Sequence, residues 1–202
     1  MAAAAKQPYR LVLASGSPAR RDLLRRAGFQ FDVIASNVDE PVEAEGDIRS
    51  YVEQIAWAKA AAVAPRVAEG IVLAADTVGW LHGKVIGKPA HEEDARRILR
   101  ALGGTRHELW TGVCLWRRPD DLQLAWQEVS RVAFKALRDD ELETYLKTRL
   151  WQGCSGAYAI QDENDPYVSL VSGSRSNVVG LPMESLTRWL DWFAAARFGQ
   201  SA

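Results

Sequence analysis

The sequence has little cysteine and histidine, and its positive and negative charges nearly balance. Its 202 residues contain two cysteines, Cys114 and Cys154, which are too few for a disulfide framework or a cysteine zinc site. The formal net charge of −1 gives no general attraction to nucleic acid or to a membrane surface, so we expect neither as a partner. No run of residues approaches the roughly 20 apolar residues of a membrane-spanning helix. Any binding of an anion must therefore be local.

The amino terminus and the composition are typical of a globular protein. The opening Met-Ala-Ala-Ala-Ala-Lys is too short and too weakly hydrophobic for a signal peptide, so we expect a cytoplasmic protein. We expect residues 1–10 to form a disordered tail and residues 11–198 to form one domain. With 48% hydrophobic and 25% charged residues, a chain of this length can bury a core without disulfides.

The most informative stretch is an apolar run that ends in a carboxylate. Residues 71–75 are all apolar, which predicts a strand that is buried on both faces, and Asp76 follows where this run ends. Ligands of α/β proteins gather at the carboxyl ends of strands, so Asp76 is a candidate site residue. Lys88 comes 12 residues later, after a turn at His82 and Gly83. These residues predict an anion site, although an ordinary turn aspartate and a solvated lysine remain the alternative.

A second candidate site lies at the first strand and helix of the chain. Residues 11–14 read as a short strand, with Ser17 as the N-cap and Pro18 as the first residue of the following helix. The amino end of a helix attracts phosphate, whereas the cations Arg20 and Arg21 oppose the helix dipole there unless an anion joins them. This pattern favours a phosphate cradle, and two solvated arginines remain the alternative.

Two further features bear on metal and anion binding. Asp39 and Glu40 form an acidic pair that could hold Mg²⁺ or Mn²⁺, although surface loops often carry such pairs. The helix expected over residues 48–64 places Lys59 on its apolar stripe, four residues after Ile55. An ammonium group there must either extend outward to water or meet an anion.

The remaining segments predict the rest of an α/β fold. Gln161 follows a glycine-containing stretch, and its amide could read a base edge or simply face solvent. His107 and Thr111 are more often structural than catalytic in such a context. We expect further helices over residues 92–102, 139–150 and 182–199, and strands over residues 31–36, 105–116, 122–137 and 168–171.

Several short motifs together resemble one known family, the Maf-type nucleoside triphosphate pyrophosphatases. Each motif is weak alone, but their order is that of the family, and the match runs from about Leu11 to Leu190. The motifs lie at residues 13–18 (LASGSP), 75–78 (ADTV), 87–89 (GKP), 111–113 (TGV), 156–158 (GAY), 160–161 (IQ) and 178–182 (VVGLP).

This resemblance implies a fold, a reaction and a set of site residues. The implied fold is a single α/β domain of two lobes, a mixed β-sheet flanked by helices with a cleft, of the Maf and ITPase kind. The implied reaction is metal-dependent hydrolysis of a nucleoside triphosphate to the monophosphate and pyrophosphate, usually by a homodimer. The implied roles are catalysis for Asp76, Lys59 and Lys88, phosphate binding for Ser15, Ser17 and Arg20, base selection for Ala19, Thr77 and Gln161, and binding of Mg²⁺ or Mn²⁺ for Asp39, Glu40 and Asp76.

The chain departs from the family pattern at positions that affect substrate choice. Ala19 stands where the family usually has its first arginine, a position that the 7-methylguanosine triphosphate subgroup also changes, usually to tryptophan. Thr77 and Gln161 resemble the dTTP/UTP subgroup, whereas Cys154 replaces a lysine that is common in that subgroup. We therefore expect a pyrophosphatase for a pyrimidine or modified nucleotide, with 7-methyl-GTP as the alternative. A non-catalytic nucleotide-binding regulator of cell division is disfavoured because Asp76 is present.

Overall fold

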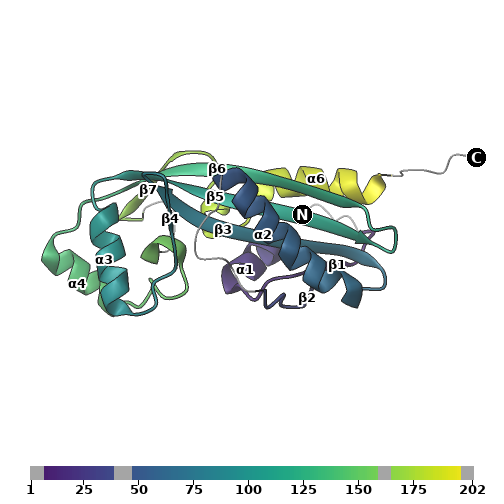
Figure 1. Ribbon diagram of the computed structural model, residues 1–202, viewed down its shortest axis with the longest axis horizontal. Helices are drawn as coiled ribbons and strands as arrows, with labels where there is room; N and C mark the ends of the chain where they lie inside the picture. The colour runs from purple at the N-terminus through teal and green to yellow at the C-terminus, as the bar shows by residue number, and fades with distance from the viewer. Residues whose placement is uncertain (1–6, 39–46, 159–164, 197–202) are drawn as a thin grey trace, which may run out of the picture.

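A mixed β-sheet runs the length of the protein (Figure 1). The structure is a computed structural model, and it describes residues 7–38, 47–158 and 165–196. Within these residues the sheet has seven strands, of which six follow the order β2-β1-β3-β5-β6-β7, while β4 pairs with β3. Their bounds are β1 (Leu11–Leu13), β2 (Asp32–Val33), β3 (Gly70–Leu81), β4 (Lys84–Ile86), β5 (Arg106–Arg118), β6 (Gln123–Phe134) and β7 (Val168–Ser172).

Two short strands share one edge of β3 and leave a gap between them. Strand β1 pairs in parallel with residues 71–73 of β3, and β4 pairs antiparallel with residues 79–81. The opposite edge of β3 pairs with β5 along nearly its whole length. On the edge of β3 that carries β1 and β4, the described part of the chain therefore provides no strand partner for residues 74–78. This gap lies between β1 and β4.

Helices cover both faces of the sheet around β1. Helices α1 (Pro18–Arg26) and α6 (Met183–Ala195) pack on one face, where Leu24, Leu186 and Phe193 join a buried apolar cluster. Helix α2 (Ile48–Val63) packs on the other face along β3 and β5. Alternate residues of β3 point into the two clusters, Leu73 toward α6 and Val72 toward α2. The apolar run of the sequence is thus a strand that is buried on both faces, as predicted.

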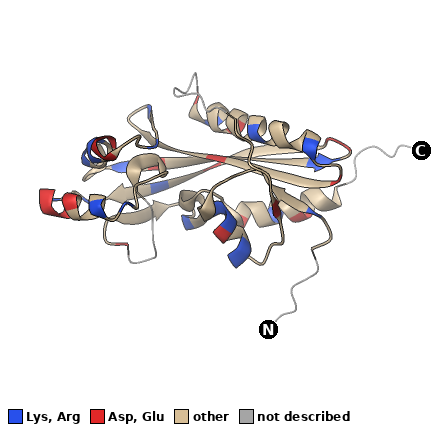
Figure 2. Cartoon of the chain, turned by 90° about the horizontal axis from the view of Figure 1, so that it is seen from below, with Lys and Arg blue, Asp and Glu red and all other residues tan. Residues whose placement is uncertain are grey.

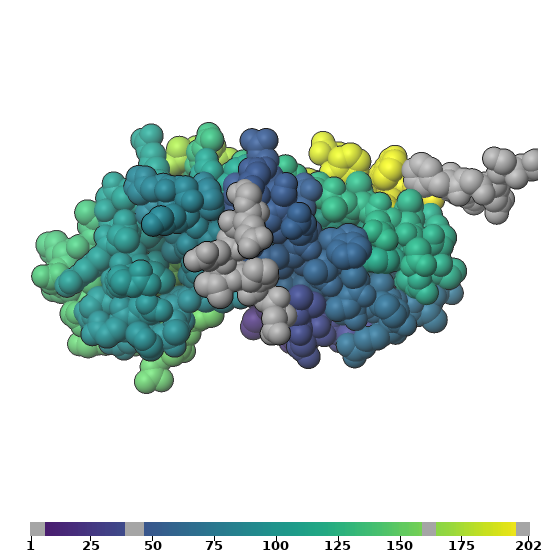
Figure 3. Space-filling model, viewed as in Figure 1, coloured from purple at the N-terminus to yellow at the C-terminus, as the bar shows by residue number. Residues whose placement is uncertain are grey.

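A second lobe forms around the other end of the long strands. It contains β4, β7, helices α3 (Glu92–Leu102) and α4 (Asp139–Lys147) and the 3₁₀ turn η2 (Ser155–Ala157), packed around residues such as Leu99, Leu146 and Tyr158. Figure 3 shows the same division on the surface, with α3 at one end and α2 toward the other. Figure 2 shows charges of both signs on the outer helices, whereas the sheet between them is mostly uncharged.

The predicted α/β fold of two lobes is confirmed, with differences at the ends of elements. Strand β3 continues to Leu81, so Asp76 lies inside a strand and the prediction that the strand ends near it is wrong. The prediction of a strand over 31–36 is also too long, because β1 ends at Leu13 and offers β2 no further partner. Helix α4 ends at Lys147 rather than near residue 150. The proposed domain limits stay a prediction, since residues 1–6 and 197–202 lie outside the described part.

The buried His107 predicts a pH-dependent stability of the second lobe. His107 is 3% exposed, its Nε2 lies 2.7 Å from the Tyr158 hydroxyl, and burial lowers its pKa to about 4. An unfolded histidine has a pKa near 6.5, so between these values the unfolded chain binds a proton that the folded chain does not. The free energy of unfolding should therefore fall by about 2 kcal/mol on going from pH 7 to pH 5 through this residue alone.

Urea unfolding of wild type and His107→Gln at both pH values measures this contribution. Carboxylates also titrate in this range, so the informative quantity is the difference between the two proteins. We expect the wild type to lose more stability than the variant when the pH falls. An equal loss in both proteins would contradict the assignment of this pH dependence to His107.

Candidate active site

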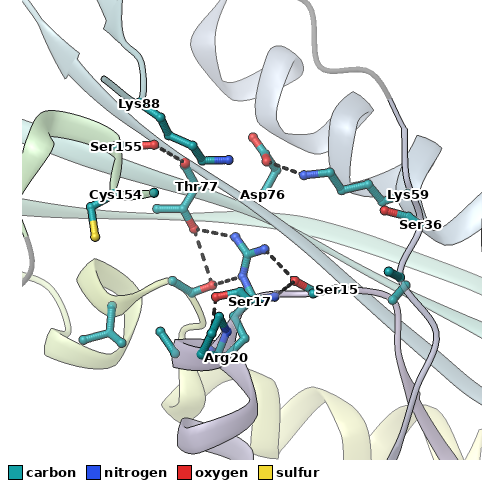
Figure 4. Close-up of a pocket in the computed structure, with 18 of the residues that line it drawn as sticks. Ser15, Ser17, Arg20, Ser36, Lys59, Asp76, Thr77, Lys88, Cys154 and Ser155 are labelled. Carbon is teal, nitrogen blue, oxygen red and sulfur yellow. Dashed lines mark hydrogen bonds and ion pairs between the residues drawn. The ribbon is translucent and has the colours of Figure 1, made fainter. Parts of the chain in front are cut away.

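The gap along the edge of β3 opens into a cleft of about 660 Å³ between the two lobes. Figure 4 shows the polar side chains that gather there. The cleft is lined by residues 14–20, 35–38, 152–155 and 178–180, together with Lys59, Asp76, Thr77, Lys88, Leu109 and Tyr158. It lies beyond the carboxyl end of the parallel strand β1, which is where ligands of α/β proteins gather.

The open edge explains why two consecutive residues of one strand face the same cleft. Neighbouring side chains in a strand point to opposite faces of the sheet. Asp76 accordingly faces α2, and Thr77 faces α1. Both nevertheless line the cleft, because no neighbouring strand in the described part of the chain covers this edge. A ligand in the cleft can therefore touch both faces of the sheet.

Asp76 and Lys59 form a buried ion pair. The Lys59 Nζ donates to Asp76 Oδ1 at 2.7 Å, and the two residues are 7% and 3% exposed. The lysine on the apolar stripe of α2 thus meets an anion, which is the second of the two outcomes considered from the sequence. Asp76 Oδ2 is buried and has no hydrogen-bond partner among the described residues. A buried carboxylate oxygen normally has a partner, so this atom points to a ligand, a metal or a water.

The amino end of α1 opens onto the same cleft. The Ser17 hydroxyl accepts from the Arg20 backbone N–H at 3.4 Å, which makes Ser17 the N-cap as predicted, and Pro18 is the first helical residue. The Ser15 hydroxyl accepts from the Ser17 backbone N–H at 3.2 Å and so fixes the turn before the helix. A helix of nine residues that begins at a cleft can bind phosphate through its dipole and amino-terminal N–H groups.

Arg20 ties three separate segments together beneath the cleft. Its guanidinium donates to the Gly180 carbonyl at 2.8 Å, to the Ser15 hydroxyl at 3.1 Å and to the Thr77 hydroxyl at 3.2 Å. Arg20 is 9% exposed. Its guanidinium therefore positions the turn that contains Ser15 relative to β3, and its direct contact with phosphate stays a prediction.

Lys88 brings a second cation into the cleft from the other lobe. In Figure 4 the ammonium groups of Lys88 and Lys59 point toward Asp76 from opposite sides. Cys154 also lines the cleft, and burial raises the pKa of its thiol more than the nearby charge of Lys88 lowers it. Ala19 lines the cleft at the start of α1, where its small side chain leaves room. Asp39, Glu40 and Gln161 lie outside the described residues, so their predicted roles stay predictions.

Asp76 is the candidate metal ligand that the described residues place in the cleft. They contain no group of three or more His, Cys, Asp or Glu side chains that could hold a metal ion. Mg²⁺ is commonly bound by one or two carboxylates, with water and substrate phosphates as the other ligands. The buried Asp76 Oδ2 fits one such carboxylate oxygen.

Three residues of the site were not singled out for it from the sequence. The Ser155 hydroxyl donates to the Thr77 carbonyl at 3.2 Å, and the Thr111 hydroxyl lies 2.9 Å from that of Thr77. The Gly180 carbonyl accepts from Arg20. Thr111 and Gly180 belong to motifs in the sequence, and this membership was the only signal that could have identified them.

Comparison with known proteins gives a consistent result. The family model described as Maf-like protein matches residues 10–193. The dTTP/UTP pyrophosphatase of Anaeromyxobacter dehalogenans is 48% identical over 176 residues, which cover 86% of this chain and 89% of that protein. The dTTP/UTP pyrophosphatase of Rhodopirellula baltica is 39% identical over 188 residues, which cover 92% of this chain and 83% of that protein.

Solved structures show the same architecture at low sequence identity. The Ham1 protein of Staphylococcus aureus matches with a TM-score of 0.53 at 15% identity, over 92% of this chain and 97% of that chain. The HAM1 protein of Coxiella burnetii matches with a TM-score of 0.54 at 14% identity, over 93% of this chain and all of that chain (100%). These two likenesses concern the fold alone. On the family model and the relatives, the chain belongs to the Maf-like protein family.

Proposed function

We propose that this protein is a nucleoside triphosphate pyrophosphatase that acts on dTTP and UTP and releases the monophosphate and pyrophosphate. The names of its relatives support the reaction and the pyrimidine substrates. The observation that carries the proposal is the buried carboxylate of Asp76, a residue that lines the cleft and whose Oδ2 has no partner among the described residues. Such a carboxylate oxygen suits a general base for a water molecule.

In the proposed reaction, Asp76 accepts a proton from the water that attacks the α-phosphorus. Lys59 holds Oδ1 at 2.7 Å, which orients the carboxylate and leaves Oδ2 to accept the proton. The α–β phosphoanhydride bond breaks, and pyrophosphate leaves with the electron pair of that bond. Phosphoryl transfer of this kind depends mainly on positioning and on stabilising the charge that develops on oxygen.

The cations around the cleft would stabilise that charge. Lys88 approaches from the second lobe, and the amino end of α1 faces the cleft from the first. The hydroxyls of Ser15 and Ser17 lie in the turn before α1, where they can orient phosphate oxygens. We propose that the triphosphate lies between these groups and Asp76.

A divalent cation is part of the proposal. Mg²⁺ or Mn²⁺ would be held by Asp76 and by phosphate oxygens, with Asp39 and Glu40 as further ligands from outside the described residues. When bound, such a cation neutralises charge on the leaving pyrophosphate and makes bound water more acidic. We also propose that the protein is a cytoplasmic homodimer, as the family resemblance implies. In the described part of the chain, no helix is long and apolar enough to span a membrane.

A nucleotide panel tests this function. We expect release of pyrophosphate and monophosphate from dTTP and UTP, with slower release from CTP and 7-methyl-GTP, because Thr77 is of the dTTP/UTP type. The assay is run with Mg²⁺, with Mn²⁺ and with EDTA, and EDTA should abolish release. Identifying the products as monophosphate rather than diphosphate locates the bond that is cleaved.

Each alternative function predicts a different result in this panel. A preference for 7-methyl-GTP would identify that nucleotide as the substrate. Ala19 would then have the role of making room for a larger base. No release from any nucleotide, by folded protein that still binds UTP, would contradict the pyrophosphatase and favour a nucleotide-binding regulator. Activity that persists in EDTA would contradict the requirement for a metal but not the pyrophosphatase function.

A further inference from the structure

A line of hydrogen bonds runs from the cleft into the core behind Thr77. The Thr77 hydroxyl accepts from the Arg20 guanidinium at 3.2 Å and lies 2.9 Å from the Thr111 hydroxyl. The Thr111 hydroxyl in turn lies 3.3 Å from the Asn177 backbone carbonyl. Thr111 and Asn177 are completely buried, at 0% exposed, whereas Thr77 is half-buried and lines the cleft.

The two end groups and the short distance between the two threonine hydroxyls favour one direction for the protons of this line. A guanidinium can only donate and a carbonyl can only accept, whereas each threonine hydroxyl has one proton to donate. When Thr111 donates to the Asn177 carbonyl, its oxygen accepts the proton of Thr77. Thr77 then accepts from Arg20 and has one further lone pair. In this arrangement Thr77 meets a ligand in the cleft as an acceptor.

We propose that Thr111 is a positioning residue for base selection: it makes the Thr77 hydroxyl an acceptor for an N–H group at position 3 of the pyrimidine ring. This inference rests on the proposed function. Uracil and thymine carry an N–H at position 3 of the ring, whereas cytosine has an unprotonated nitrogen there. The network would thus contribute to a preference for UTP and dTTP over CTP.

A count of hydrogen bonds supports this direction. With an N–H ligand, the bonds from Arg20 to Thr77, from Thr77 to Thr111 and from Thr111 to Asn177 all remain, and the ligand adds a fourth. With an acceptor ligand, Thr77 must donate outward. Thr111 has only one proton, so it can then keep a bond to Thr77 or to Asn177 but not to both. The acceptor ligand therefore leaves one buried hydrogen bond fewer in the protein, which corresponds to about a three- to tenfold weaker interaction.

The surroundings of Thr77 suit a base. Leu109, Val178, Val179 and Tyr158 line the cleft and supply apolar surface. Strand alternation places Thr77 on the face of β3 opposite to Asp76, so a base beside Thr77 leaves the triphosphate close to the carboxylate and the lysines. The Thr77 hydroxyl can also donate to the Gly180 carbonyl at 3.4 Å, but the Thr111 hydroxyl at 2.9 Å is the closer acceptor for its proton.

Steady-state pyrophosphate release from UTP and CTP tests the role of Thr111. Thr111→Val keeps the shape of the side chain and removes the hydroxyl, whereas Thr111→Ser keeps the hydroxyl. We expect Thr111→Val to lower the ratio of kcat/KM for UTP to that for CTP by about three- to tenfold. Thr111→Ser should keep the wild-type ratio. A general loss of packing would lower both values of kcat/KM together and leave their ratio unchanged.

A second variant keeps the test decisive if Thr111→Val does not fold. Thr77→Val removes the hydroxyl that is proposed to contact the base, and it should lower the same ratio. An unchanged ratio in folded Thr111→Val, or in folded Thr77→Val, would overturn the inference while the pyrophosphatase function stands. A wild-type protein that releases no pyrophosphate from any nucleotide would overturn the proposed function instead.

Discussion

Asp76→Asn should lower kcat/KM for pyrophosphate release from UTP by about 10²–10⁴-fold, the usual contribution of a general base. An amide has nearly the shape of the carboxylate, and its oxygen can still accept from Lys59, but it cannot take a proton from water. Asparagine also offers a poorer oxygen ligand to a divalent cation. The measurement is steady-state release under the conditions of the nucleotide panel, together with the melting temperature of the variant.

Asp139→Asn is the matched control for this substitution. Asp139 lies on α4, its side chain is 90% exposed, and it contacts only Arg100 among the ion pairs of the described residues. The same chemical change there should leave the rate within about twofold, because surface substitutions have small effects. Activity of folded Asp76→Asn close to that of wild type would contradict the assignment of Asp76 as the base.

Gly112→Ala should lower the free energy of unfolding by about 3 kcal/mol, the upper end of the usual cost of overpacking, and abolish activity. A Cβ at position 112 would lie 2.0 Å from the Val52 backbone carbonyl oxygen and 2.3 Å from its carbon. Backbone atoms of a packed helix cannot move aside as a flexible side chain can, so α2 must shift away from β5. Helix α2 carries Lys59, whose ion pair with Asp76 would then break.

Gly87→Ala provides the control for stability. A Cβ at position 87 would meet no atom within 4 Å, and the backbone there does not lie in the left-handed region. Urea unfolding should show Gly87→Ala close to wild type and Gly112→Ala strongly destabilised. A Gly112→Ala variant that unfolds at the same urea concentration as Gly87→Ala would contradict the close packing of α2 on β5.

Local sequence signals were sufficient where the structure depends on neighbours in the chain. Helix α1 begins at Pro18 after the Ser17 cap, and α3 spans residues 92–102, both as predicted. Capping, the positions of proline and glycine, and the 3.6-residue period of apolar side chains act within a few residues, so they can be read directly. The ends of β2 and β3 could not be read in this way, because strand length depends on distant partners.

The sequence by itself determined the set of chemical groups at the site and the family to which their order points. It identified Asp76, Lys88, Lys59 and the Ser15–Arg20 turn as candidates, but it left their alternatives open. Only the tertiary structure paired Lys59 with Asp76, which are 17 residues apart, and Arg20 with Gly180, which are 160 residues apart.

The edge of β3 shows most clearly what the tertiary structure decided. Strands β1 and β4 pair with the same edge, and within the described ranges no strand pairs with residues 74–78 between them. No periodicity in the sequence reports which edge a strand will occupy, because side-chain alternation specifies the faces of a sheet and not its neighbours. This pairing brings Asp76 and Thr77 from opposite faces of one strand to a single cleft, and so places the proposed base beside the residue proposed to read the nucleotide.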